Sequence, residues 1–99
     1  MIHVVAILTA KPGQRAAMLQ ALHGNLEAVR AEQGCLEYGP MIDATHTPSP
    51  FGPDTIVVIE KWANEDALAA HAKSAHMAAY AAATRDMVAS RAIHVMQPA

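Results

Sequence analysis

The chain has 99 residues, a formal net charge of −2 and no cluster of Lys or Arg, which argues against nucleic acid or an anionic membrane as its main partner. Its length suits one domain over residues 1–99, but a domain of this size buries only about two thirds of the surface of the unfolded chain. Hydrophobic residues make up 53% of the sequence and aromatic residues only 4%, so we expect a thin core and a small, apolar or weakly polar ligand.

The cysteine content and the N-terminal segment bear on the compartment. Cys35 is the only cysteine, which excludes an internal disulfide and a metal site made of thiolates alone. The first residues form no basic leader, and their apolar run is too short to span a membrane. We therefore expect a cytoplasmic protein without a membrane partner.

The first half of the chain predicts a strand, a helix, a second strand and a long loop. Residues 2–9 are apolar and β-branched, which is typical of a strand. An amphipathic helix follows and stops near Gly34; its apolar residues recur at three- and four-residue spacing, at Leu19, Leu22, Leu26 and Val29. Residues Leu36–Ile42 alternate in character and predict the second strand. The loop Asp43–Pro53 contains three Pro, which forbid regular structure, and its length suggests a lid or a subunit contact.

The second half predicts a strand, a divided helix and a final strand. Residues Ile56–Trp62 are β-branched and extended, and Asn64 then offers a helix N-cap followed by two acids. The helical region runs from residue 65 to about 90. We expect a break near Lys73–Ser74, with Ser74 capping a second helix that begins at Ala75. With a fourth strand at Ala92–Gln97, the pattern is the ferredoxin-like βαββαβ arrangement, an α+β fold with a four-stranded antiparallel sheet.

The strands are apolar on both faces. Val5 and Ile7 oppose the other apolar side chains of the first strand, and Val57 and Ile59 do the same in the third. Helices on one side of the sheet cannot cover both faces, so the second cover is expected to be the sheet of another subunit. The sequence therefore predicts a homodimer.

Several fragments, in this order and spacing, resemble the antibiotic biosynthesis monooxygenase (ABM) domain family, and within it the bacterial quinol monooxygenases. They are Lys11–Gly13, Gly34–Tyr38, Pro40–Met41, Asp43, Pro53–Val57, Ile59–Trp62, Ala70–His71, His76–Tyr80 and Gln97–Pro98. The resemblance implies a dimeric α+β barrel. It also implies oxygenation of an aromatic quinol or a polyketide phenol by O2 without a cofactor.

The residues between Glu60 and Tyr80 offer a basis for that chemistry. An aromatic diol reacts more readily with O2 once it has lost a proton, because the anion gives up an electron more easily. The site then needs a base with a pKa near neutrality, hydrogen-bond donors and dry walls. His71 and His76 are the expected bases, with Glu60 as the competitor. The expected donors are Tyr80, Tyr38 and the indole of Trp62.

Structural roles compete with these assignments. His71 also suits the C-terminal end of a helix, where the dipole stabilises it, and Trp62 also suits a packing anchor at the end of a strand. Met41 and Met77 are candidate substrate contacts, but methionines also fill gaps in a core.

Two further functions are compatible with this fold. A non-catalytic small-molecule-binding protein of the same fold would show no turnover. A haem-degrading monooxygenase is disfavoured because the first strand has no Asn, His71 stands where a Trp is expected, and Ala81 falls near the expected axial ligand. No metal is expected either, since residues 71 and 76 lie about 140° apart on a continuous helix, although a break at Ser74 loosens this argument.

Overall fold

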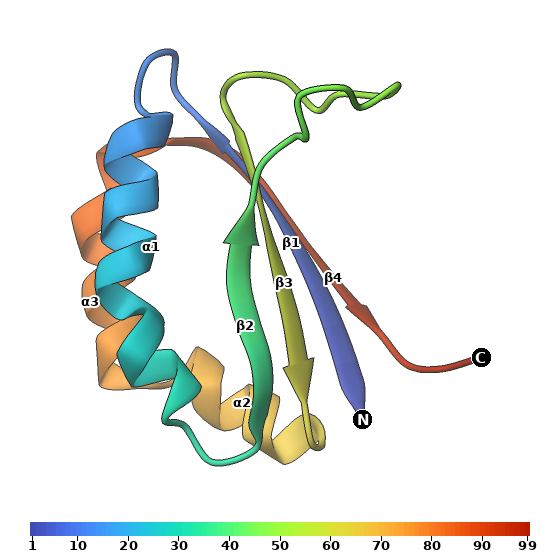
Figure 1. Ribbon diagram of the computed structural model, residues 1–99. Coiled ribbons are helices and arrows are strands. Elements are labelled where there is room, and N and C mark those ends of the chain that lie inside the picture. The colour runs from blue at the N-terminus through green and yellow to red at the C-terminus, as the bar shows by residue number, and fades with distance from the viewer.

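The computed structural model describes residues 1–99 and confirms the ferredoxin-like α+β fold (Figure 1). Three helices pack against one four-stranded antiparallel sheet. In chain order the elements are β1 (Ile2–Ala10), α1 (Arg15–Arg30), β2 (Cys35–Met41), β3 (Thr55–Trp62), α2 (Glu65–Ala72), α3 (Ala75–Thr84), a 3₁₀ turn (Arg85–Met87) and β4 (Val88–Met96).

The strand order is β2-β3-β1-β4, so the first and third strands of the chain form the middle of the sheet. Their register pairs Val4 with Glu60 and Ala6 with Val58, and these four side chains lie on the face that the helices cover. Every second residue of β1 is buried there, which is the period-two pattern of a half-covered strand. The largest fully buried side chains of this core are Trp62, Met18, Leu22, Ile56, Val4, Val29 and Val58.

The predicted break in the second helical region is confirmed. The Asn64 side chain accepts a hydrogen bond from the N–H of Ala67 at 2.9 Å and begins α2. The Ser74 hydroxyl accepts one from the N–H of Met77 at 3.4 Å and begins α3. Each cap satisfies a backbone donor that the first turn of a helix leaves unpaired.

The end of the helical region differs from the prediction. It ends at Thr84 and passes through the 3₁₀ turn, so β4 begins at Val88 rather than at Ala92. Pairing with β1 accounts for this, because Val88 lies opposite Ala10 and β4 therefore follows β1 over almost its whole length. Ala-rich segments favour helix, but here the ladder to β1 takes precedence.

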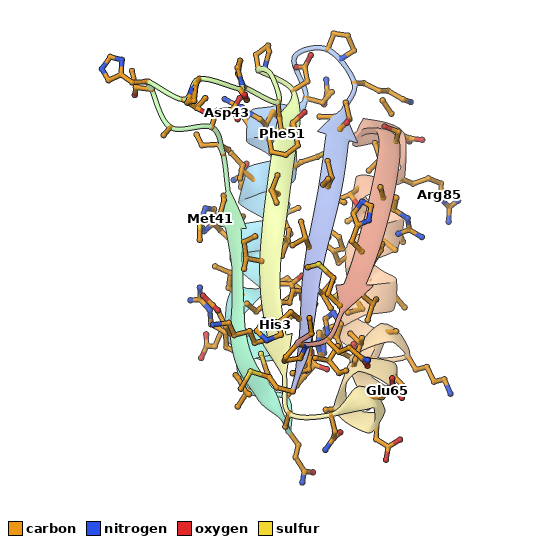
Figure 2. All side chains as sticks on the ribbon, turned by 90° about the vertical axis from the view of Figure 1, so that its right-hand side faces the viewer. His3, Met41, Asp43, Phe51, Glu65 and Arg85 are labelled. Carbon is orange, nitrogen blue, oxygen red and sulfur yellow. The ribbon has the colours of Figure 1, made fainter.

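The second face of the sheet has no helix over it, as Figure 2 shows from that side. Val5, Ile7, Val57 and Ile59 lie on this open face and are only half-buried. The doubly apolar strands of the prediction are therefore present. None of the three helices combines the length and the apolar content needed to cross a bilayer.

The side chain of Asp43, near the start of the loop after β2, holds the two ends of this loop together. The Asp43 carboxylate accepts hydrogen bonds from the N–H groups of Phe51 at 3.0 Å and Gly52 at 2.9 Å. These bonds hold the pKa of Asp43 below its ordinary value. Phe51 is 59% exposed, and the loop does not line the cavity described below.

Candidate active site

A cavity of about 730 Å³ lies between the covered face of the sheet and the helices. Most of its lining is apolar, with side chains from β1, β3, α1, α2 and α3. Its polar lining includes Tyr38, Glu60, His71, Tyr80 and Arg91. An apolar cavity with a few converging polar groups is the usual form of a small-molecule site.

His71 is the most constrained of these polar residues. It lies in the last turn of α2, is only 5% exposed, and its Nδ1 lies 2.7 Å from Oε2 of Glu32. Its ring packs on Trp62, with centroids 4.6 Å apart, and meets Tyr38 edge-on at 5.6 Å. Because a carboxylate accepts hydrogen bonds, Nδ1 carries the hydrogen and Nε2 keeps its lone pair.

The second ring nitrogen of His71, Nε2, is free of partners. It has no hydrogen-bond partner within the protein, whereas every fully buried polar side-chain atom of the chain has one. Nε2 is therefore not sealed in the packed core. Since His71 lines the cavity, we place its free lone pair there.

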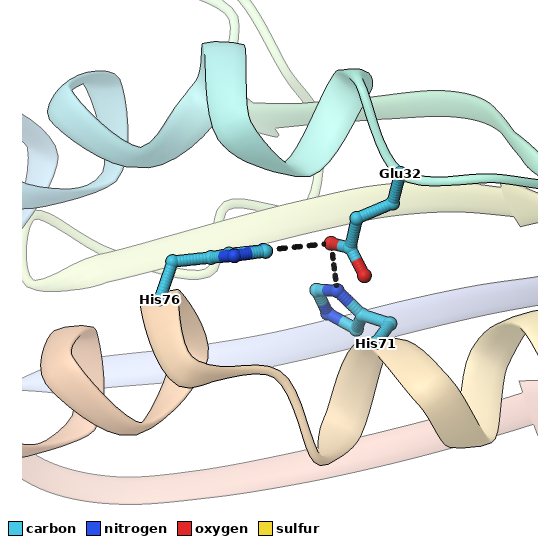
Figure 3. Close-up of side chains that lie close together, drawn as sticks. All are labelled: Glu32, His71 and His76. Carbon is cyan, nitrogen blue, oxygen red and sulfur yellow. Dashed lines mark hydrogen bonds and ion pairs between the residues drawn. The ribbon is translucent and has the colours of Figure 1, made fainter.

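Glu32 organises both histidines, and the sequence analysis missed it. It lies in the turn between α1 and β2, and its Oε2 also lies 2.9 Å from Nε2 of His76 (Figure 3). No local pattern marks this carboxylate, because it is 39 residues from His71 along the chain. Only the packing of the turn against the helices brings the three side chains together.

Gly34 allows that packing. Its φ of +84° lies in the left-handed region, and an added Cβ would stand 2.5 Å from the Cβ of Ala67 in α2. Its carbonyl accepts the N–H of Ala63 at 2.8 Å, which ties the turn to the segment before α2. A residue with a side chain would push this turn, and Glu32 with it, away from α2.

Glu60 is a buried carboxylate on the cavity wall. It is 6% exposed, and the indole N–H of Trp62 donates to its Oε1 at 2.9 Å. Burial raises the pKa of Glu60 above its ordinary value, against the opposing effects of that hydrogen bond and of His71. Trp62 itself is fully buried and lies behind the cavity wall, so it orients Glu60 and supports His71.

The two tyrosines remain protonated near neutral pH. Burial raises the pKa of the Tyr38 phenol, and the charge of Glu60 adds to this effect. Burial also raises the pKa of Tyr80, although Thr84 and Arg91 oppose it. Both phenols can therefore donate a hydrogen bond to an anion in the cavity.

Of the other predicted site residues, one lines the cavity and two do not. Met77 lines the cavity. His76 does not, because its Nε2 is directed at Glu32 and its side chain is 30% exposed. Met41 lies opposite Val57 on the open face of the sheet, outside the cavity. Strand parity explains this, because residues an odd number apart, such as 38 and 41, point to opposite faces.

The profile of the family described as "Antibiotic biosynthesis monooxygenase" matches residues 1–83. The chain belongs to this family. It is 36% identical over 102 residues to the protein named "Probable quinol monooxygenase YgiN" of Escherichia coli, covering 99% of this chain and 98% of the relative.

Solved structures share the fold of this chain. Rv0793 from Mycobacterium tuberculosis has a TM-score of 0.84 and 25% identity, covering 99% of this chain and 94% of that chain. A crystal structure described as "antibiotic biosynthesis monooxygenase" has a TM-score of 0.84 and 23% identity, covering 100% of this chain and 99% of that chain.

Arg91 lines the cavity and is a second residue that the sequence did not point to, after Glu32. It lies in β4, beyond the residues that the family profile matches, and opposite Leu8 on the covered face. The expected start of β4 at Ala92 had left it outside the sheet. In this member of the antibiotic biosynthesis monooxygenase family, the last strand thus adds a cation to the cavity wall.

Proposed function

We propose that the protein is a cofactor-independent monooxygenase that oxidises an aromatic quinol or a polyketide phenol with O2. One observation carries the proposal: His71 is oriented by Glu32 and presents a free ring nitrogen to an apolar cavity that also contains two phenols. Family membership and the name of the E. coli relative support the same reaction class.

The first step is removal of a proton from the substrate hydroxyl by Nε2 of His71. Glu32 holds the ring through Nδ1 and stabilises the positive charge that the ring gains, as a carboxylate does for a histidine base. His71 therefore takes the role of base ahead of His76, which does not line the cavity. Glu60 competes as a base in principle, but Trp62 already occupies one of its oxygens.

The second step is electron transfer from the substrate anion to O2. The phenols of Tyr38 and Tyr80 and the guanidinium of Arg91 line the cavity and can donate to the anions that form. The substrate radical and the superoxide that result combine to form a carbon–oxygen bond, and loss of water completes the reaction. A quinol and O2 then give a hydroxyquinone and water, so the substrate supplies all the electrons and no flavin or metal is required for the balance.

We also propose that the protein acts as a homodimer joined through the open face, without nucleic acid or membrane as a partner. The support is the row of apolar side chains on that face, Val5, Ile7, Val57 and Ile59, which no helix covers. Burial of such a face in a second copy removes apolar area from water.

Oxygen uptake with a reduced naphthoquinone tests the function. The protein is first treated with a chelator, and no flavin is added. We expect uptake above the rate of spontaneous oxidation and in proportion to protein. Saturable substrate binding without uptake would instead support a non-catalytic binder. A haem titration that gives a stable absorption band, followed by its decay with a reductant, would support haem degradation.

A further inference from the structure

Three potential metal ligands meet where the turn after α1 approaches the junction of α2 and α3 (Figure 3), and of these only His71 also lines the cavity. The ligand atoms of Glu32, His71 and His76 all lie within 4.8 Å of one another. We propose that these residues form a binding site for one divalent transition-metal ion, with Zn²⁺ as the model ion, and that its occupancy inhibits the enzyme.

The break between α2 and α3 is what makes this set possible. On a continuous helix, residues 71 and 76 would face different directions, since five residues correspond to about 140° of rotation. Here His71 ends α2 and His76 lies in the first turn of α3, so both rings turn toward the same carboxylate oxygen. The five-residue separation of His71 and His76 therefore does not prevent them from binding one metal ion.

The donor set selects the kind of ion. Two imidazoles and one carboxylate suit Zn²⁺ and its transition-metal neighbours, whereas Mg²⁺ and Ca²⁺ prefer oxygen ligands alone. Three protein ligands with water in the fourth position form a common zinc arrangement. The Ser74 hydroxyl lies 3.3 Å from Nε2 of His76, close to the three ligands.

The present distances require only a small opening. The two nitrogens lie 2.7 and 2.9 Å from Oε2 of Glu32. Ligand atoms around a tetrahedral ion with bonds of about 2.0–2.1 Å lie roughly 3.3–3.4 Å apart, so each of these two nitrogen–oxygen pairs must separate by about half an ångström. An ion can approach from solvent, because the side chain of His76 is 30% exposed while that of His71 is 6% exposed.

The inhibitory part rests on the proposed function. A metal ion on Nδ1 of His71 displaces the hydrogen that Glu32 now accepts, and neutral imidazole then carries its hydrogen on Nε2. That nitrogen becomes a donor and can no longer take the proton of the substrate. Occupancy of the site therefore removes the base without any ligand in the cavity itself.

Calorimetric titration of Zn²⁺ into chelator-treated, full-length protein tests the site. We expect one ion per chain, and at least about a tenfold loss of affinity in Glu32→Gln and in His76→Ala, because each removes a ligand. His46→Ala is the matched control, since His46 is exposed in the loop after β2 and should leave affinity unchanged. Titration with Co²⁺ should give the visible absorption of a four-coordinate ion in the wild type and in His46→Ala, but not in the two ligand variants.

The outcomes separate the site from the function. Absence of Zn²⁺ binding, or equal affinity in the wild type and in both ligand variants, would overturn the site. Binding needs no substrate, so it stands even if oxygen uptake fails. If uptake occurs and Zn²⁺ binds to the site without lowering it, the inhibitory role is overturned.

Discussion

The two faces of the sheet come from the same strands but have opposite character. The covered face holds Glu60, His71 and Tyr38 around a cavity, and every fully buried polar side-chain atom there has a hydrogen-bond partner. The open face holds aliphatic side chains at the middle of β1 and β3, with His3 and Lys61 paired near one end. Burial beneath the helices positions the polar groups on one face, while the other face is left without a helix over it, as the proposed association with a second copy requires.

The largest expected effect is on the covered face. His71→Ala should lower turnover of a reduced naphthoquinone by about a hundred- to ten-thousand-fold, because a positioned base contributes about that much to a rate. His76→Ala and Glu60→Gln should lose less, since the first residue lies outside the cavity and the second is held by Trp62. Oxygen uptake measured against pH gives the comparison.

The control for these variants is His46→Ala, which changes an exposed loop residue. Circular dichroism should show the same fold in all four proteins. Wild-type turnover in His71→Ala, with the acidic limb of the pH profile retained, would transfer the role of base to Glu60 or to the substrate.

The open face should respond to a charge in its centre. Ile7→Lys is expected to convert a dimer into a monomer of about 10.5 kDa by light scattering, because an unpaired ammonium group cannot be buried against an apolar sheet at low cost. Ala82→Lys, at an exposed position of α3, should leave the dimer intact. A monomeric wild type at micromolar concentration would refute the dimer itself.

Gly34 connects the turn of Glu32 to α2, and its replacement should cost stability. Gly34→Ala forces a side chain into a positive-φ conformation and against Ala67, at about 1–3 kcal/mol for the backbone alone. The melting temperature should then fall by about 4–8 °C for each kcal/mol.

Gly24→Ala is the matched control for Gly34→Ala. It lies inside α1, where an added Cβ meets nothing within 4 Å, so a gain of about 0.5–1 kcal/mol is expected. Equal effects of the two substitutions would show that the close approach at Gly34 does not constrain the turn.

The smallest effect concerns the pH dependence of stability at Glu60. Burial raises its pKa in the folded state above the ordinary value of 4.5, so its contribution to stability is complete below that pH and is lost as the pH rises through the folded value. Glu60→Gln, which cannot ionise, should therefore gain melting temperature relative to the wild type as the pH rises from 4 to 7. A difference in melting temperature between the two proteins that stays constant over this range would contradict the raised pKa of Glu60.

Local signals in the sequence accounted for much of the fold. The caps at Asn64 and Ser74 depend on residues within three positions, so the division of the helical region was predictable. The start of β4 was not, because the Ala-rich segment favours helix while pairing with β1 decides the boundary.

The site was predictable only in part, for the same reason. His71, Tyr38, Tyr80, Glu60 and Met77 were predicted from residue type and from the family resemblance, and all five line the cavity. Glu32 and Arg91 belong to distant segments, and only the tertiary fold brings Glu32 to His71 and Arg91 to the cavity wall. Met41 was assigned without regard to strand parity, which places it on the open face.

The central claim, that the covered face supports insertion of oxygen from O2, is tested most directly by isotope labelling. The chelator-treated wild type is supplied with a reduced naphthoquinone under ¹⁸O₂, and the product is analysed at once by mass spectrometry. We expect a hydroxylated quinone that carries one heavy oxygen atom, with no more hydrogen peroxide than the spontaneous reaction gives. An unlabelled quinone formed together with an equal amount of hydrogen peroxide would contradict it and identify an oxidase instead.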